Sequence, residues 1–135
     1  AGFMEVTGQA KGIKVKESNA AAYSFEAGRT AMLKELKGTH AEAYFCGDDV
    51  MSIGALSAIN SSGLSAPTDI GIIGLNDMEM AKWENIDLTT IRQPIKQIVD
   101  SSVELVMAAL EDSNRHPEAR LFSCQVIERG TLRPI

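Results

Sequence analysis

Short apolar runs of strand length alternate with amphipathic segments of helix length over the first half of the chain. The runs lie at residues 13–16, 43–46 and 70–75, and amphipathic segments occupy residues 24–37 and 49–62 between them. Two parallel strands need a crossover of about a dozen residues or more, usually a helix. The alternation therefore predicts an α/β fold in which helices pack on a parallel sheet.

The second half of the chain adds further elements to this pattern. Residues 78–84 are expected to form one or two helical turns, residues 88–92 an extended piece, and residues 121–127 a last strand. Residues 95–110 place apolar side chains at steps of three and four, which predicts a long amphipathic helix. Ser24 stands where it can cap the N-terminus of the first predicted helix.

Composition excludes several classes of function. The 135 residues fit one domain, and 13 Lys plus Arg against 18 Asp plus Glu give a net charge of -5. These residues alone do not supply the basic surface that binds nucleic acid. No apolar run approaches the ~18 to 20 residues that span a bilayer, and no secretory signal pattern is present. We therefore expect a cytoplasmic protein with no membrane contact.

Polar side chains follow the second and third predicted strands. Asp48 and Asp49 come after one strand, and Asn76 and Asp77 come after the next. Ligands of open parallel sheets bind beyond the carboxyl ends of the strands. If the two strands are neighbours, these carboxylates and this amide share one edge of the sheet, where they suit a hydroxyl-rich ligand.

The same residues also have structural interpretations. Asp49 and Asp77 each stand just before a predicted helical turn, where Asp is a favoured N-cap, so we expect them to be helix caps or secondary ligand contacts. Ligand binding is expected of Asp48 and Asn76. Tyr23 lies in the loop that leaves the first strand, and its ring can either stack on a sugar or pack in the core.

The sequence offers no catalytic arrangement. His40 and Glu42 match part of the zinc deaminase motif, but no P-C-x-x-C follows them. Neither His40 nor His116 has an arranged nucleophile, and no phosphate-binding loop is present. We therefore predict that the chain is not an enzyme and has no catalytic residues, cofactor or metal.

Three runs of sequence carry a family resemblance. They are AYFCGDDVMSIGAL at 43–56, SGLSAPTDIGIIGLND at 62–77 and LTTIRQPI at 88–95. Together they resemble the effector-binding region of the LacI/GalR family of bacterial transcription regulators, in register from Ala1 to about Arg129. Such a series of spaced motifs is far more specific than any single one of them.

The resemblance implies a periplasmic-binding-protein-like fold, in which a three-layer lobe has a parallel sheet flanked by helices. Two such lobes hold a sugar or related metabolite between them, and ligand binding changes the spacing of the DNA-binding heads of a homodimer. On this pattern residues 1–90 and 120–135 mainly form the C-terminal lobe. Residues 94–113 are a helix that belongs to the N-terminal lobe.

The resemblance also assigns residues to the site. Asp48 matches the family's ligand-binding Asn, and Asn76 matches the first Asp of the family's G-F-D-D motif, so the two side chains are exchanged here. Tyr23 matches an aromatic residue that stacks on the sugar, and Ile95 matches a residue at the cleft between lobes. Because donor and acceptor positions are swapped, the identity of the ligand cannot be taken from relatives.

The family dimerises through the helices that start near residues 49 and 78. The implied interface residues are Met51, Ala55, Met78 and Trp83. Trp83 is then either an anchor of that interface or a buried residue of the domain itself.

The resemblance places further segments before Ala1: the DNA-binding head, the first lobe and the first strand of the second lobe. That strand would lie between the strands predicted at 13–16 and 43–46, so its absence leaves two strand edges unpaired. The chain is therefore expected to be the incomplete C-terminal part of a longer protein. Either the rest of that protein or another copy of the chain would fill the gap.

These observations predict a function. The chain is expected to be the effector-binding and dimerisation module of a LacI-type transcription regulator, with DNA bound only through an N-terminal domain absent from this chain. The alternative is a periplasmic sugar-binding protein of a transport system, because the fold is shared. The T-T-I-R-Q-P run and the lack of secretion features favour the regulator.

Overall fold

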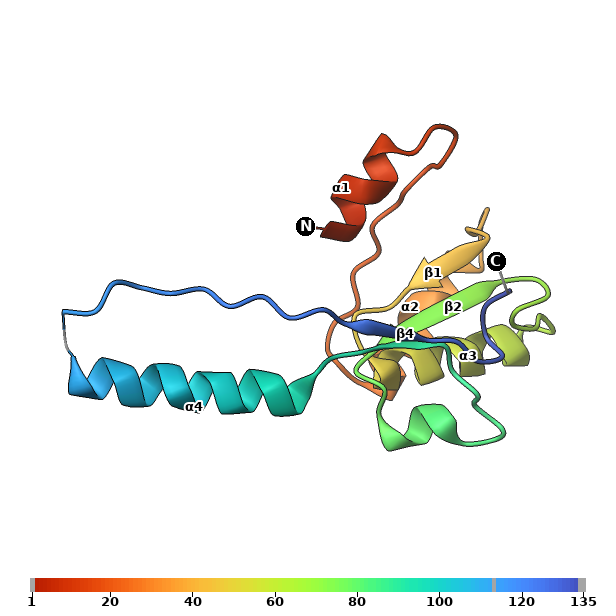
Figure 1. The fold of residues 1–135 in the computed structure, drawn as a ribbon. Coiled ribbons are helices and arrows are strands. Elements are labelled where there is room, and N and C mark those ends of the chain that lie inside the picture. Colours follow the sequence, from red (N-terminus) through yellow and green to blue (C-terminus); the bar gives the residue numbers. More distant parts are fainter. Residues whose placement is uncertain (1, 113, 134–135) are drawn as a thin grey trace.

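The computed structural model describes residues 2–112 and 114–133. The elements in chain order are α1 (Gly2–Gln9), α2 (Phe25–Glu35), β1 (Ala43–Phe45), α3 (Asp49–Ser61), β2 (Gly71–Leu75), η1 (Glu79–Lys82), β3 (Thr90–Arg92), α4 (Ile95–Glu111) and β4 (Gln125–Ile127), as labelled in Figure 1. The helices predicted at 24–37, 49–62 and 95–110 are confirmed, with small shifts at their ends. None of the described helices is long and apolar enough to cross a membrane.

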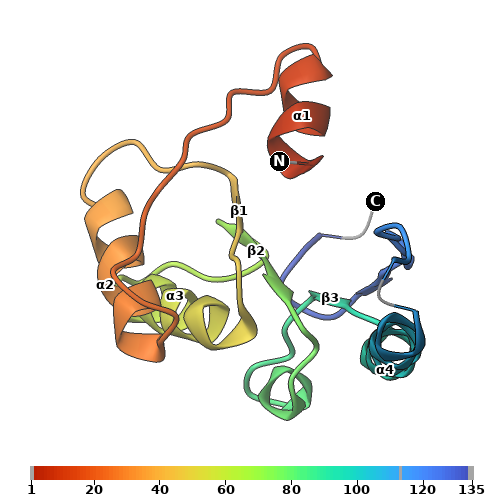
Figure 2. The same cartoon turned by 90° about the vertical axis from the view of Figure 1, so that its left-hand side faces the viewer.

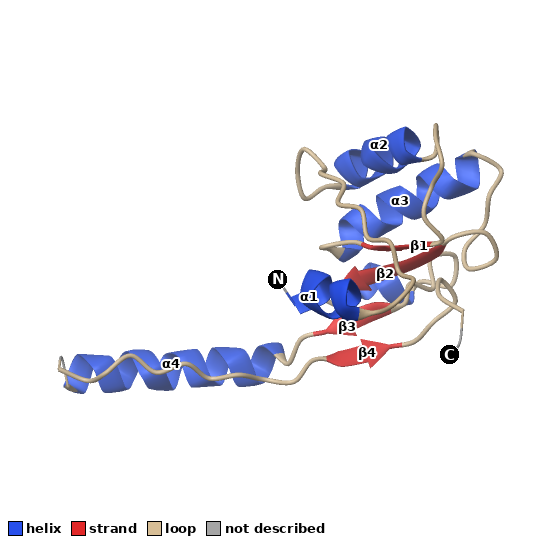
Figure 3. Cartoon of the chain, turned by 90° about the horizontal axis from the view of Figure 1, so that it is seen from above, coloured by secondary structure: helices blue, strands red, loops and turns tan. Residues whose placement is uncertain are grey.

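The described strands form a sheet in the order β1-β2-β3-β4. β1 pairs in parallel with β2, and β2 pairs in parallel with β3, which confirms the crossovers predicted from the alternating pattern. β4 is antiparallel to β3, so the predicted parallel sheet carries one antiparallel strand at its edge. The chain returns from α4 and enters the sheet beside β3 in the opposite direction (Figure 3).

The core lies between α3 and the sheet, and α2 packs on α3 (Figure 2). Ile59, Ile70, Ile72 and Leu88 are fully buried there. The two helices approach closely at Gly54, where a Cβ atom would lie within 3.0 Å of the carbonyl oxygen of Phe25. Only glycine fits this crossing, because the opposing atom belongs to a helix backbone and not to a flexible side chain.

The prediction of a strand at residues 13–16 is wrong. This segment is extended but pairs with no strand in the described part of the chain, and Ile13 is exposed. A cavity of about 410 Å³ is lined both by this segment and by β1, including Val15 and Tyr44. A strand is defined by its hydrogen-bonded neighbour, and the segment has none. The strand expected in this gap stays a prediction.

A helix that the sequence analysis did not predict lies near the same cavity. Phe3 of α1 stacks on Phe45 of β1, with the ring centroids 5.2 Å apart. Phe3 itself remains about half exposed.

The helix α4 projects from the sheet as an arm, and residues 114–124 return beside it (Figure 1). Arg120 of the returning segment donates to Ser101 Oγ at 2.9 Å and to Glu104 Oε2 at 2.7 Å. The strand predicted at 121–127 forms only at Gln125–Ile127, because these residues alone lie opposite the three residues of β3. Most of the large apolar side chains of α4, including Val103 and Leu110, are exposed, and Ile98 and Leu105 are partly buried.

Candidate ligand-binding site

The ends of β1 and β2 bring Asp48 and Asn76 together. The two strands are parallel neighbours, so the residues that follow them lie at the same edge of the sheet. Asn76 Nδ2 donates a hydrogen bond to Asp48 Oδ2 at 2.9 Å. The shared edge predicted from the sequence is confirmed, and we call it the rim: Asp48, Asn76 and the side chains that contact them.

A third side chain on the rim was not predicted. Gln93 Nε2 donates to Asn76 Oδ1 at 2.6 Å, and Asp48 Oδ1 in turn accepts from the backbone N–H of Val50 at 2.7 Å. These bonds form a continuous series from Gln93 through Asn76 to Asp48. The signal for Gln93 was present in the sequence, because it follows directly after the strand predicted at residues 88–92 and so shares the carboxyl edge.

The prediction that Asp49 caps a helix is wrong. The N-cap of α3 is Asp48, whose extended backbone (φ -161°) lets its side chain accept from Val50. Asp49 is already inside the first turn and is completely buried. Its carboxylate accepts from Thr90 Oγ1 at 2.6 Å and from the backbone N–H of Met78 at 2.7 Å. Asp49 therefore has no surface with which to contact a ligand on the rim.

The environment of Asp49 is unusual for a carboxylate. Burial raises its pKa above the ordinary value, although the hydrogen bonds from Thr90 and Met78 oppose this shift. The carboxylate lies so close to β2 that a Cβ atom at Gly74 would overlap its Oδ1 atom. A glycine in this strand is therefore required for the carboxylate to occupy its place.

The prediction that Asp77 is a cap is also wrong. The residue at the N-cap of η1 is Met78, which makes no capping bond with its side chain. The Asp77 carboxylate is almost completely buried and binds two arginines: Arg129 Nη2 at 2.6 Å on Oδ1, and Arg92 Nη2 at 2.6 Å on Oδ2. Burial alone would raise the pKa of Asp77, but the bonds from Arg129 and Arg92 outweigh it and lower the pKa.

Tyr23 and Ile95 lie open to solvent near the rim. A ring carbon of Tyr23 is 3.8 Å from the position that a Cβ atom at Gly47 would take, and the side chain is 81% exposed. Its alternative role as a packed core residue is therefore wrong. Ile95 is the first residue of α4, two positions after Gln93, and is 55% exposed. Ligand contact by either residue stays a prediction.

The predicted interface residues differ in their exposure. Ala55 is only 2% exposed, so this prediction is wrong for Ala55 within the single chain. It belongs to the core cluster. Trp83 is 52% exposed, which excludes its alternative role as a buried residue of the domain. Met51 and Met78 are partly buried.

Comparison with known proteins identifies the family. The periplasmic binding protein-like domain matches residues 1–132. The chain belongs to this family.

Individual members of the family give a closer placement. HTH-type transcriptional repressor CytR of Escherichia coli (strain K12) is 34% identical over 84% of this chain and 33% of its own length. The structure of a LacI-family transcriptional regulatory protein from Corynebacterium glutamicum is 31% identical with a TM-score of 0.80, over 96% of this chain and 51% of that one. The structure of the lac repressor dimer bound to operator and the anti-inducer ONPF is 28% identical with a TM-score of 0.72. The match covers 82% of this chain and 38% of that one.

These similarities confirm the resemblance drawn from the motifs. The chain is a periplasmic binding protein-like domain of the kind found in the effector-binding region of LacI/GalR regulators. It spans about a third of the length of CytR. The named relatives are transcriptional regulators, in agreement with the prediction of a non-catalytic chain. Among the residues that the structure describes, no group of His, Cys, Asp and Glu is placed to hold a metal ion.

Proposed function

We propose that the rim binds a small hydroxyl-rich effector, a sugar or related metabolite, on behalf of a cytoplasmic LacI-type transcription regulator. The observation that carries the proposal is the hydrogen-bonded series Gln93–Asn76–Asp48 at the carboxyl ends of adjacent strands. DNA would be bound through a separate head, since these residues carry a net charge of -5.

The chemistry of the rim supports this class of ligand. An ionised carboxylate has about four acceptor positions on its two oxygens, and Asp48 uses them for Val50 and Asn76 with acceptor capacity left over. Within the described residues the Asp48 carboxylate forms no ion pair that would compete for that capacity. Neighbouring hydroxyls of a sugar are suited to donate to Asp48 and to exchange bonds with the Asn76 amide. The exposed Tyr23 ring offers a surface on which the apolar face of a sugar stacks.

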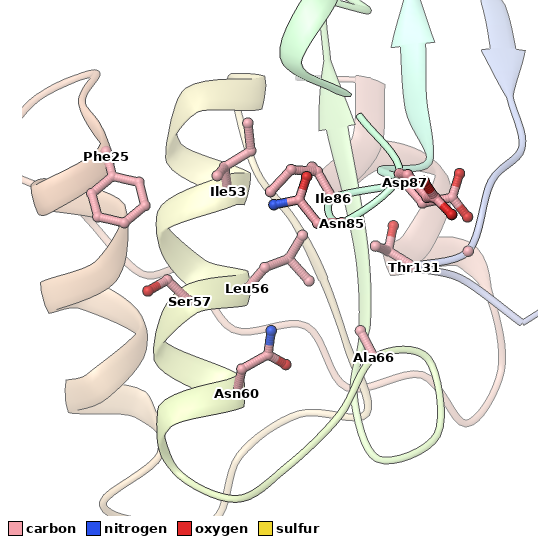
Figure 4. Close-up of a pocket in the computed structure, with 12 residues that line it drawn as sticks. Phe25, Ile53, Leu56, Ser57, Asn60, Ala66, Asn85, Ile86, Asp87 and Thr131 are labelled. Atoms are coloured by element: carbon pink, nitrogen blue, oxygen red, sulfur yellow. The ribbon is translucent and has the colours of Figure 1, made fainter. Parts of the chain in front are cut away.

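Dimerisation is the second part of the proposal. A groove of about 520 Å³ lies between α3 and the loop that follows η1. Its lining includes Ile53, Leu56, Asn60, Asn85 and Ile86, which Figure 4 labels. Part of its lining comes from α3, one of the two helices through which the family resemblance predicts dimerisation, and part from the loop that follows the other. The exposed Trp83 belongs to the same loop, and the lac repressor neighbour is described as a dimer.

The arm supports the assignment of residues 94–113 to another lobe. The α4 side chains Val99, Val103, Val106 and Leu110 are all more than half exposed, and a contiguous apolar stripe of this kind is normally covered by a partner surface. The cavity between residues 13–16 and β1 supports the proposal that a further strand completes the sheet, supplied by the same longer protein or by a second copy.

The test of the ligand proposal uses the full-length protein and a panel of pentoses, hexoses and nucleosides. A ligand at 100 times its Kd adds about 2.7 kcal/mol of stability, so the correct panel member raises the Tm. Asp48→Ala should abolish that rise. Asp69→Ala is the matched control, because Asp69 precedes β2 at the opposite edge of the sheet. If Asp48→Ala responds as the parent does, the site lies elsewhere, and a panel without any active member contradicts the ligand class.

A further inference from the structure

The turn between β2 and η1 has a strained backbone. Asn76 has φ 112° and Asp77 has φ 53°, both in the region that side-chain-bearing residues rarely adopt. Such conformations persist only when surrounding contacts hold them, and they concentrate at functional sites. Here they occur at the residue that links Asp48 to Gln93.

Asp49 holds this turn from the side of α3. Its Oδ2 atom accepts from the N–H of Met78, the residue directly after the strained pair, at 2.7 Å. Its Oδ1 atom accepts from the Thr90 hydroxyl at 2.6 Å, and Thr90 Oγ1 also accepts from the N–H of Asp77 at 3.4 Å. The turn is thereby tied to α3 and to β3 through buried groups.

Asp77 holds the turn from the other side. Its two oxygens bind Arg92, the last residue of β3, and Arg129, which follows β4. Arg129 is itself fixed, because its Nη1 donates to the carbonyl oxygen of Leu88 at 2.7 Å. Asp77 is therefore bonded to the last residue of β3 and to the segment that follows β4.

The consequence falls on the Asn76 side chain. The Asn76 amide donates to Asp48 at 2.9 Å and accepts from Gln93 at 2.6 Å. Because these two partners follow different strands, a small change in the Asn76 backbone breaks one bond or both. We propose that Asp49 and Asp77 are positioning residues that hold Asn76 where its amide spans Asp48 and Gln93. Neither contacts the effector; their importance for binding rests on the proposed function of the rim.

A double-mutant cycle in the full-length protein tests this inference by urea unfolding. In the parent, Asn76→Ala should raise the unfolding equilibrium constant about tenfold or more, because it removes a bond to a charged group and leaves Ala in a left-handed conformation. In an Asp77→Asn background the same change should cost less than about threefold, because the amide is no longer held in place. A Glu79→Ala background is the matched control and should preserve the full effect, because Glu79 pairs only with Lys82 at the surface.

Two further backgrounds keep the test decisive if Asp77→Asn does not fold. Arg92→Gln removes one of the two arginines, whose side chain is about half exposed, and should reduce the Asn76→Ala effect in part. Asp49→Ala should reduce it more than Asp49→Asn, which retains an acceptor for Met78. Equal effects of Asn76→Ala in all backgrounds would overturn the inference and make Asp49 and Asp77 purely stabilising residues. The cycle measures stability without ligand, so its failure is distinct from failure of the panel experiment.

Discussion

The most informative perturbation of the buried site is Gly74→Ala. A methyl group at Gly74 would overlap Asp49 Oδ1 and lie 3.0 Å from both Leu88 Cδ2 and Ser52 Oγ. Asp49 is completely buried and its oxygens are held by Thr90 and by a backbone N–H, so it has no open space to move into. Overpacking costs about 1–3 kcal/mol and a weakened bond to a charged group about 1.5–3 kcal/mol, which gives an expected loss of about 2.5–6 kcal/mol.

A matched control lies in the same strand. A methyl group at Gly71 meets Leu132 Cδ1 at 2.9 Å and Ala43 Cβ at 3.2 Å, and the end of the leucine side chain can turn away. Gly71→Ala should therefore stay within about 1 kcal/mol of the parent. The assay is urea unfolding of the full-length protein with both variants side by side. Equal stabilities of the two variants would refute the claim that the Asp49 carboxylate is fixed against β2.

Three further predictions concern the helices and the acid limb of stability. Gly54→Ala should lower the free energy of unfolding in urea by about 3 kcal/mol or more, because its methyl group would meet the Phe25 backbone. Gly38→Ala is the control and should be nearly neutral, because there is open space around Gly38. Ser24→Ala should cost about 1 kcal/mol in the same assay, because the Ser24 side chain caps α2. Because the pKa of Asp77 is lowered, the stability that its carboxylate contributes is complete above pH 3.8, the ordinary pKa, and is lost as the pH falls through the lowered pKa. Asp77→Asn lacks this contribution at every pH. Below pH 3.8, the urea midpoint of Asp77→Asn should therefore fall less steeply than that of the parent.

Much of the site follows from a local pattern and one topological rule. Neighbouring strands that are joined by a helix run parallel, and the residues that follow such strands lie at the same edge of the sheet. The sequence alone therefore predicts that Asp48 and Asn76 lie close together, as the structure has them. The long amphipathic helix α4 follows from an equally local signal, whereas the sequence left open whether Tyr23 is exposed or packed in the core.

The remaining features depend on contacts that are distant in the sequence. Whether Asp48 or Asp49 is the cap depends on a shift of one residue in the helix start, which propensity does not resolve. One of the two arginine partners of Asp77 is Arg129, 52 positions away, and only the return of the chain from α4 brings it there. Residues 13–16 have a strand pattern but no hydrogen-bonding neighbour among the described strands, and the pattern alone cannot supply one.

The most direct test of the central claim is a crystal structure of the full-length protein bound to the panel member that raises its Tm most. We expect a ligand hydroxyl within hydrogen-bonding distance of Asp48 and of Asn76, with the Tyr23 ring against the ligand. A ligand bound away from these residues, for example in the groove between α3 and the loop after η1, would contradict it.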